Sequence, residues 1–458
     1  MGVRPLVAGI LLALVFCAPA GAATRLASVD QTEGAISFAG ADLLYGELTG
    51  YFANEGDVIV RAVRPGRAPR VIAREHRRGD EFDAYGMEIA YTGSTSGVLI
   101  ARTDSRDEEL DSHSSETVYS KWRLRGIAAG TGERWQADAC TLSSYTFGLR
   151  PAVSGDAFLA AESGCKQGGL AVRLFSNRGA IVQRFPDARP RSFDLAGAFA
   201  TYTDGTGAVV VTGWREGRVV FGVPASALPP RYGSRLFDDG TLVLVSETRF
   251  GCDGRISTAS PSAPAPRELP VRFCTGPVAV AGDRIAFIRR AGEQFELVTV
   301  ARDGGDARPV ARFGDLDVIH GVALRAGRVA WEVSRCADQL IATSELRPRS
   351  VEPAPPTRCP SAVARREVKV SGRGELAIPI RCPLGCRLSG GTLKFVKEEN
   401  AHSGYVNIRR GTGTLPFTIT REALGRLRRH GGLKAVLSYY IDLPTGDKQR
   451  DVPVVLRP

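Results

Sequence analysis

The chain has 458 residues with a net charge of +11, and it is rich in glycine (52) and proline (27) but has only 2 methionines and 7% aromatic residues. This composition favours many short strands and turns over helices, and the length suggests two or three domains. Beyond the N-terminus no segment approaches the roughly 18 apolar residues of a membrane span, so a transmembrane segment is excluded there.

The N-terminus has the pattern of a signal peptide over residues 1–22. Arg4 precedes an apolar core from Leu6 to Ala18, and Ala20-Gly21-Ala22 supplies the small residues of a cleavage site. We therefore expect export, to the cell surface or beyond it.

Cleavage would remove Cys17 and leave an even number of cysteines, which in an exported chain predicts disulfides. Pairing neighbours along the chain is the simplest of the possible connectivities. The eight cysteines are Cys140, Cys165, Cys252, Cys274, Cys336, Cys359, Cys382 and Cys386. A zinc site is a weaker interpretation, because Cys382 and Cys386 offer only two ligands and the five histidines are scattered. We expect no metal and no cofactor.

A short sequence motif recurs along the first three quarters of the chain: apolar residues, a turn glycine, then alternating apolar residues. We count seven copies, which centre on Gly40, Gly86, Gly155, Gly197, Gly240, Gly282 and Gly327. The spacings are 46, 69, 42, 43, 42 and 45 residues, and the long one contains a polar insertion over residues 103–120. Spacings near 40–45 residues are typical of four-stranded propeller blades.

The repeat predicts a β-propeller over residues 24–347, because sheets packed radially bury the faces that a single sheet would leave exposed. We expect seven blades, or six if the first copy is irregular. The last unit lacks a strand after Leu346, so residues 25–30 would complete it as the outer strand and clasp the ring.

The apolar–glycine–apolar hairpins resemble those of TolB-like and WD40-like secreted bacterial propellers, over about residues 25–350. The resemblance implies the architecture and says little about activity, because one fold hosts many functions. The Gly-His and Trp-Asp signatures of true WD40 repeats are absent.

The cysteines agree with this assignment. Cys165, Cys252 and Cys336 fall in turns between second and third strands, whereas Cys140, Cys274 and Cys359 fall at or after fourth strands. Both kinds of position lie on one face of a propeller, so the three wider bridges are predicted on that face.

Residues 348–360 form a proline-rich linker, and residues 361–458 predict a small β-sandwich of seven short strands. One helix is expected between Thr420 as its cap and Gly431 as its stop. The sandwich is expected to be immunoglobulin-like, and its Cys382-Pro-Leu-Gly-Cys386 turn resembles domains of surface proteins from high-GC Gram-positive bacteria.

Charge separates the two predicted domains. Residues 360–458 hold 18 Lys and Arg against 8 Asp and Glu, whereas residues 23–359 hold 41 of each sign. Arg421, Arg426, Arg428, Arg429 and Lys434 are the candidate residues for binding an anionic surface such as a cell-wall polymer or phospholipid headgroups. The alternative is a solvated basic face without a partner. Nucleic acid is not expected, because aromatic residues do not interleave the basic ones.

We find no motif for catalysis and expect a non-enzyme. Gly93 to Gly97 has Thr95 at its centre, so it is a hairpin tip and no nucleophile elbow. His113 and His320 are isolated. The insertion lacks the order and the turn glycine of a calcium loop, so it is interpreted as a solvated acidic loop; its acidic residues are Asp104, Asp107, Glu108, Glu109 and Asp111.

The sequence thus predicts an exported, monomeric binding protein of the cell envelope. The disulfide-bearing face of the propeller would recognise a protein or cell-wall polymer, and the basic sandwich would serve as tether or spacer. The alternative is a propeller glycan hydrolase or lyase with carboxylates, such as Asp315 and Asp317, at the channel mouth.

Overall fold

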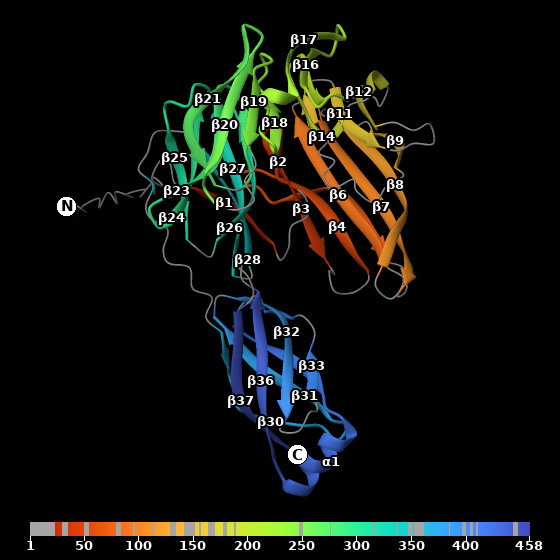
Figure 1. Ribbon diagram of the computed structural model, residues 1–458. Helices are drawn as coiled ribbons and strands as arrows, with labels where there is room; N and C mark the ends of the chain where they lie inside the picture. Colours follow the sequence, from red (N-terminus) through yellow and green to blue (C-terminus); the bar gives the residue numbers. More distant parts are fainter. Residues whose placement is uncertain are drawn as a thin grey trace, which may run out of the picture.

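The computed structural model describes two bodies of β-strands, joined by a segment that lies mostly outside the described residues (Figure 1). The described residues are 23–29, 35–49, 55–78, 84–94, 97–111, 114–128, 134–141, 152–154, 157–163, 170–176, 181–186, 189–246, 251–274, 276–314, 317–336, 338–346, 351, 361–383, 385–395, 400–403, 406–408, 411–442 and 448–458. The expected signal peptide and nearly all of the expected linker fall outside these ranges.

The first body is built from four-stranded antiparallel sheets, of which seven are described. The first three are β2 (Ser37–Ala39), β3 (Asp42–Thr49), β4 (Glu55–Val63), β5 (Arg70–Arg78); β6 (Ala84–Ser94), β7 (Gly97–Asp111), β8 (Ser114–Ala128), β9 (Arg134–Thr141); and β10 (Ala152–Ser154), β11 (Ala157–Ser163), β12 (Leu170–Ser176), β13 (Ile181–Pro186). The next three are β14 (Arg189–Ala196), β15 (Phe199–Thr203), β16 (Val209–Gly213), β17 (Arg218–Val223); β18 (Tyr232–Leu236), β19 (Leu242–Ser246), β20 (Gly254–Ser260), β21 (Ala263–Phe273); and β22 (Ala279–Ala281), β23 (Arg284–Ala291), β24 (Gln294–Ala301), β25 (Arg308–Phe313). The seventh is β26 (Val318–Arg325), β27 (Arg328–Arg335), β28 (Asp338–Glu345) and β1 (Thr24–Val29), and a 3-10 helix, η1 (Ala225–Ala227), lies between the fourth and fifth sheets.

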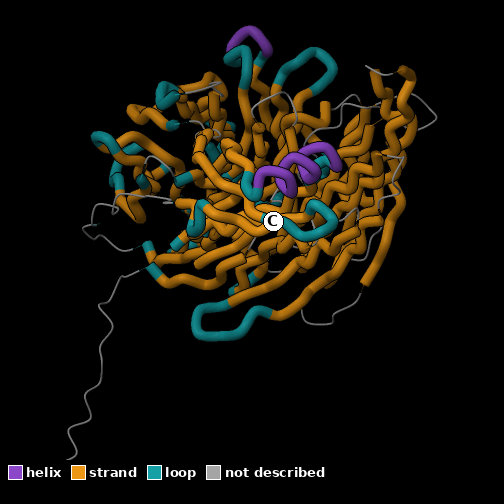
Figure 2. Tube along the Cα trace, turned by 90° about the horizontal axis from the view of Figure 1, so that it is seen from below, coloured by secondary structure: helices purple, strands orange, loops and turns teal. Residues whose placement is uncertain are grey.

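The first strands of the sheets lie around a common centre. Each contacts the first strand of the next sheet, in the order β2, β6, β10, β14, β18, β22 and β26, and β26 contacts β2 in turn. Figure 2, the view from below, shows that strands make up nearly all of the described chain. Four-stranded sheets arranged radially in this way are the β-propeller architecture, so the chain is all-β with a propeller fold.

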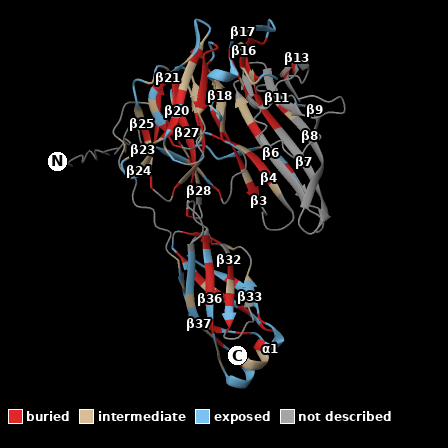
Figure 3. Ribbon diagram, viewed as in Figure 1, coloured by how far each residue is buried: buried red, intermediate tan, exposed pale blue. Residues whose placement is uncertain are grey.

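Neighbouring sheets pack through alternate residues of their middle strands. On β23, Ile285 and Phe287 join an apolar cluster with the fifth sheet, whereas Ala286 and Ile288 join one with the seventh. Because successive residues of a strand point to opposite faces, this division means that both faces of the sixth sheet are buried. Two-sided burial explains the continuous apolar run Leu242–Val245 in β19, the second strand of the fifth sheet (Figure 3).

The clasp predicted for residues 25–30 is confirmed. β1 pairs antiparallel with β28, from Thr24 opposite Thr343 to Val29 opposite Gln339, and it is the outer strand of the seventh sheet. Val29 is buried in a cluster that also holds Leu43 and Tyr45 of the first sheet. The N-terminal strand therefore fastens the last sheet and also packs toward the first.

Five of the predicted hairpin glycines stand in first turns with positive φ: Gly40, Gly197, Gly240, Gly282 and Gly327. At Gly197 the turn also meets the next sheet, because a Cβ there would lie 2.5 Å from the Asp238 backbone oxygen. A side chain at this position would have to displace backbone, so glycine is required for conformation and for space.

The second unit corrects two predictions. Gly86 lies inside β6, and the first turn of this sheet falls between Ser94 and Gly97, where the hairpin tip was expected. The expected acidic loop is also wrong: residues 103–111 continue β7, which pairs with β8 as far as Asp111 opposite Ser114. Backbone pairing carries this extension, so its polar sequence had no apolar periodicity to reveal it.

The second body is a two-sheet β-sandwich with one helix. One sheet has the order β29 (Ala362–Val363), β31 (Glu375–Cys382), β35 (Gly411–Thr418). The other has the order β30 (Glu367–Lys369), β37 (Lys448–Arg457), β36 (Leu433–Asp442), β32 (Cys386–Phe395), β33 (Asn400–Ser403), with β34 (Val406–Ile408) also on β32. β29 and β33 were not predicted from the sequence. A single apolar cluster, with Ile378 from one sheet and Leu437 from the other, fills the space between them.

The helix α1 (Arg421–His430) has the ends that the sequence predicts. The Thr420 side chain accepts a hydrogen bond from the Ala423 backbone N–H at 3.2 Å, and Gly431 ends the helix in the left-handed conformation with φ 67°. Ala423 and Leu427 are buried in the sandwich core, so the helix covers that core with one face and turns its arginines outward.

Candidate functional site

Two disulfides are described, and each joins one cysteine to the next cysteine along the chain. Cys252, between β19 and β20, is bonded to Cys274, directly after β21, and Cys382 is bonded to Cys386 in the turn from β31 to β32. Cys336, in the turn from β27 to β28, is also disulfide-bonded. Its expected partner Cys359 lies outside the described residues, as does Cys165, while Cys140 lies on β9; the pairings Cys140–Cys165 and Cys336–Cys359 stay predictions.

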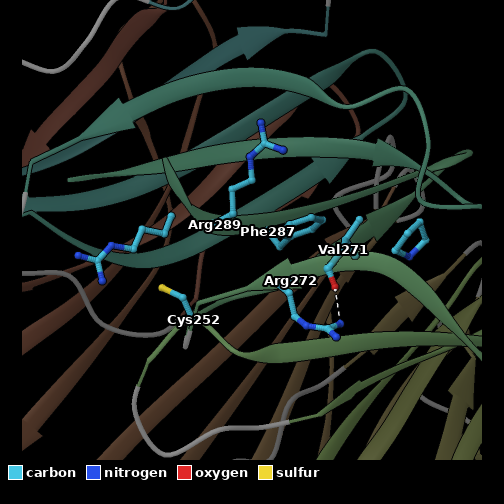
Figure 4. A pocket seen from close by; sticks show the side chains of 7 residues that line it. Cys252, Val271, Arg272, Phe287 and Arg289 are labelled. Carbon is cyan, nitrogen blue, oxygen red and sulfur yellow. Dashed lines mark hydrogen bonds between the residues drawn. The ribbon is translucent and has the colours of Figure 1, made fainter. Parts of the chain in front are cut away.

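A hollow of about 250 Å³ lies beside the Cys252–Cys274 bond, between the fifth and sixth sheets (Figure 4). Its residues come from the end of β21, the end of β23 and the Cys252 turn: Cys252, Pro270, Val271, Arg272, Phe287, Arg289 and Arg290. These ends point to the face on which the second-to-third-strand turns lie. The hollow therefore opens on the disulfide-bearing face that the sequence suggested for recognition.

Arg272 lies on one side of the hollow, and it shares the Glu268 carboxylate with Arg255. Its guanidinium donates to Glu268 at 2.8 Å and to the Val271 backbone oxygen at 3.3 Å. Arg255 donates to the other oxygen of Glu268 at 3.0 Å. Hydrogen bonds from Arg272 and Arg255 lower the pKa of Glu268, so the carboxylate is ionised at neutral pH, yet two cations share its one negative charge.

Arg289 is held in the same way on the opposite side. Its Nε and one terminal nitrogen donate to Glu296 at 2.9 and 2.7 Å, and Arg312 donates to the second oxygen of Glu296 at 3.2 Å. The Glu296 side chain is only 2% exposed, whereas those of the two arginines are about one-third exposed. The buried carboxylate thus fixes two guanidiniums that still reach solvent.

Arg290 completes the hollow with an exposed charge. Its Nε donates to the Gly292 backbone oxygen at 3.1 Å, and no carboxylate of the described residues forms an ion pair with it. The seven residues around the hollow include three arginines and no acidic residue. The site is therefore a positively charged recess with an apolar floor formed by the buried Phe287 ring.

The carboxylates considered for catalysis are not brought together among the described residues. Asp317 is buried and binds Arg335 through both oxygens at 2.9 and 2.6 Å, while it also accepts the Gly314 N–H. Asp315 lies outside the described part of the chain. The five acidic residues of the insertion lie along β7. The Asp317–Arg335 pair therefore has a structural role, connecting the start of β26 to the end of β27.

Only one of the two histidines lies within the described residues. His320 on β26 lies 2.6 Å from the Ser334 hydroxyl on β27, and His113 lies outside the described residues. Within the described ranges no group of three or more His, Cys, Asp or Glu side chains is arranged to hold a metal ion. No helix in these ranges is long and apolar enough to cross a membrane.

The five basic residues singled out in the sandwich are gathered by α1 and the start of β36. Arg421, Arg428 and Arg429 are exposed on the helix and Lys434 is exposed on β36, while Arg426 is half-buried. Arg428 donates to the Gly372 backbone oxygen at 2.8 Å, which ties the helix to the turn before β31. These charges form one basic end of the sandwich, next to the C-terminal strand.

The arginines of the hollow were missed in the sequence. Arg289 and Arg290 end a strongly apolar strand, and Arg272 lies two residues before Cys274. Two signals were present: the abrupt change from apolar to basic residues, and the proximity to a cysteine assigned to the recognition face.

Comparison with known proteins gives no family. No protein-family model matches this chain, and no curated protein matches it. Among solved structures, it is similar to BamB from Moraxella catarrhalis at 12% identity, covering 69% of this chain and 86% of that chain with a TM-score of 0.38. It is also similar to Sqt1 from Saccharomyces cerevisiae at 7% identity, covering 87% of this chain and 99% of that chain with a TM-score of 0.39.

Proposed function

We propose that this chain is an exported, monomeric binding protein of the cell envelope. Residues 1–22 would direct export, and the seven sheets would form the seven blades of one closed propeller. The disulfide-bearing face would recognise a protein or cell-wall polymer, and the sandwich, which we take to be immunoglobulin-like, would hold the chain near an anionic surface. We assign no catalytic role to any residue.

The observation that carries this proposal is the position of the basic residues. One end of the sandwich exposes four cations, and the apolar residues of this body are gathered in a single internal cluster. The four are Arg421, Arg428, Arg429 and Lys434. Clustered cations attract polyanions over about a Debye length, roughly 8 Å at physiological salt. A separate, near-neutral propeller would then be free to present its own face.

Support for a binding role also comes from the carboxylates. A glycosidase needs a pair of carboxyl groups on either side of the scissile bond, and the buried Asp317 and Glu296 are each held by arginines.

The test is retention of the purified mature chain on bacterial cell walls. Arg421→Glu, Arg428→Glu and Arg429→Glu would be combined in one variant, with Arg67→Glu, Arg218→Glu and Arg231→Glu as a control that makes the same charge change on exposed propeller residues. We expect the first variant to lose retention at low salt and the control to keep it, with release of the wild type by high salt. Equal retention of both variants would refute the tether.

A further inference from the structure

We propose that the hollow between the fifth and sixth sheets binds one oxyanion group, a phosphate or a carboxylate, of a ligand held on the disulfide-bearing face. This inference rests on the proposed function and names the ligand chemistry of that face. It comes from the charge, the shape and the edges of the hollow.

The charge around the hollow is positive after its ion pairs are counted. Arg272 and Arg255 share Glu268, and Arg289 and Arg312 share Glu296. Arg290 has no carboxylate partner among the described residues. These groups are five guanidiniums and two carboxylates, of which only Arg272, Arg289 and Arg290 line the hollow; the exposed acidic neighbours Asp253 and Glu293 do not line it. An incoming anion meets a net attraction that the existing pairs do not cancel.

The arginines are also held in place before a ligand arrives. Glu296 fixes Arg289 through two hydrogen bonds, and the Val271 backbone and Glu268 fix Arg272. A planar guanidinium that is already oriented loses less entropy when it binds an oxyanion. Two of the three cations are therefore prepared for a phosphate or carboxylate rather than being mobile surface charges.

The floor and wall of the hollow strengthen this attraction. Phe287 is 1% exposed at the floor, and Pro270 and Val271 form an apolar side. Apolar surroundings reduce the local screening by water, so the same charges interact more strongly than on an open surface. The Cys252–Cys274 bond ties the turn between β19 and β20 to the end of β21, so it joins two parts of the fifth sheet that border the hollow.

The strand beside the hollow disfavours recognition by backbone pairing. β21 is the outer strand of the fifth sheet, and outer strands are the usual place for an added peptide strand. Pro264, Pro266 and Pro270 lack the N–H that such a strand would need. A ligand at this edge is therefore held by side chains, which here are guanidiniums.

The test measures protection of single arginines in the full chain. Phenylglyoxal modifies guanidinium groups, and mass spectrometry would give the modification rate of Arg272 and Arg290, with exposed Arg218 at the opposite end of the propeller strands as internal reference. The probes are inorganic tripolyphosphate and citrate, compared with sodium chloride at equal ionic strength. We expect Arg290 to be modified at least about fivefold more slowly with a saturating probe, while Arg218 keeps its rate.

Two variants make the result specific. Arg290→Glu should weaken protection of Arg272 by about fivefold, the upper range for one exposed ion pair, whereas Arg218→Glu should leave it unchanged. Protection by tripolyphosphate alone would support a phosphate ligand, and protection by citrate alone a carboxylate ligand. Equal slowing at Arg218, or slowing confined to Arg421, Arg428 and Arg429, would overturn the proposal. The latter result would leave the basic end of the sandwich standing as an anion-binding tether.

Discussion

The clasp strand offers the sharpest test of the propeller, because a short N-terminal segment closes a sheet whose other strands lie some 290 residues later. Val29 is the residue of β1 that is buried, at 7% exposure, and it packs with Leu43, Tyr45 and Ile341 from two different sheets. The neighbouring Ser28 lies on the same strand and is exposed. Val29→Ala and Ser28→Ala therefore truncate a buried and an exposed side chain at adjacent positions of the same strand.

The magnitude follows from the methyl groups removed. Val29→Ala deletes two buried methyl groups, each worth about 0.8 kcal/mol by transfer, and leaves a small cavity. We expect a loss of about 2 kcal/mol from the free energy of unfolding of the propeller. Ser28→Ala should change it by less than about 0.5 kcal/mol, as is usual for exposed positions.

Tryptophan fluorescence during urea unfolding is a suitable assay, because all four tryptophans, Trp122, Trp135, Trp214 and Trp331, lie in the propeller and none in the sandwich. Trp331 is buried on β27, next to the strand that the clasp pairs with. The signal therefore follows the propeller and ignores unfolding of the second body, which has its own core. Equal midpoints for the two variants would refute the view that β1 holds the last sheet in place.

Three further predictions concern single contacts. Replacing both Cys252 and Cys274 by alanine should cost about 3 kcal/mol in the chain-entropy model and lower the urea midpoint in tryptophan fluorescence, whereas the same change at Cys382 and Cys386 should leave this signal unchanged. Burial raises the pKa of Asp194 above its ordinary value of 3.8, against the attraction of Arg235. A group with a raised folded-state pKa contributes stability below its unfolded pKa, and this contribution is lost as the pH rises through the folded-state pKa. Asp194→Asn keeps an acceptor for the Leu236 N–H, which lies at 2.8 Å in the wild type, so its melting temperature relative to wild type should be higher at pH 7 than at pH 4. Thr420→Ala removes the cap of α1 at a cost of about 1 kcal/mol, which hydrogen exchange should record as faster exchange of the helix amides, with exposed Arg421→Ala as control.

The repeat and the clasp strand β1 were predictable because both have a recognisable signature in the amino-acid sequence. A turn with positive φ selects glycine, as at Gly197 and Gly327, and the spacing of these glycines gives the length of a four-stranded unit. The helix of the sandwich was predictable for the same reason, since Thr420 and Gly431 have distinct chemical roles at its ends.

The strands of the second sheet were predicted less well because the glycine and hydropathy patterns of this unit are ambiguous. Gly86 followed by Ile89-Ala90-Tyr91 imitates a turn and a second strand, yet all of these residues belong to β6. The long β7–β8 extension is held by backbone hydrogen bonds, and these give no hydropathy signal. Length and polarity alone could not separate a ribbon from a loop.

The position of the hollow follows from where two-sided burial ends along β23. Residues 284–288 are buried between the neighbouring sheets, Arg289 is half-buried, and Arg290 is exposed. The pairing of Arg289 with Glu296 follows from the β23–β24 hairpin register, and the pairing of Glu296 with Arg312 from the next strand pair. The approach of Arg272 from the fifth sheet, however, depends on the radial packing of sheets and not on any local pattern. The recess thus lies where the buried parts of the strands end, and those buried parts, rather than Arg272, Arg289 and Arg290, hold the neighbouring sheets together.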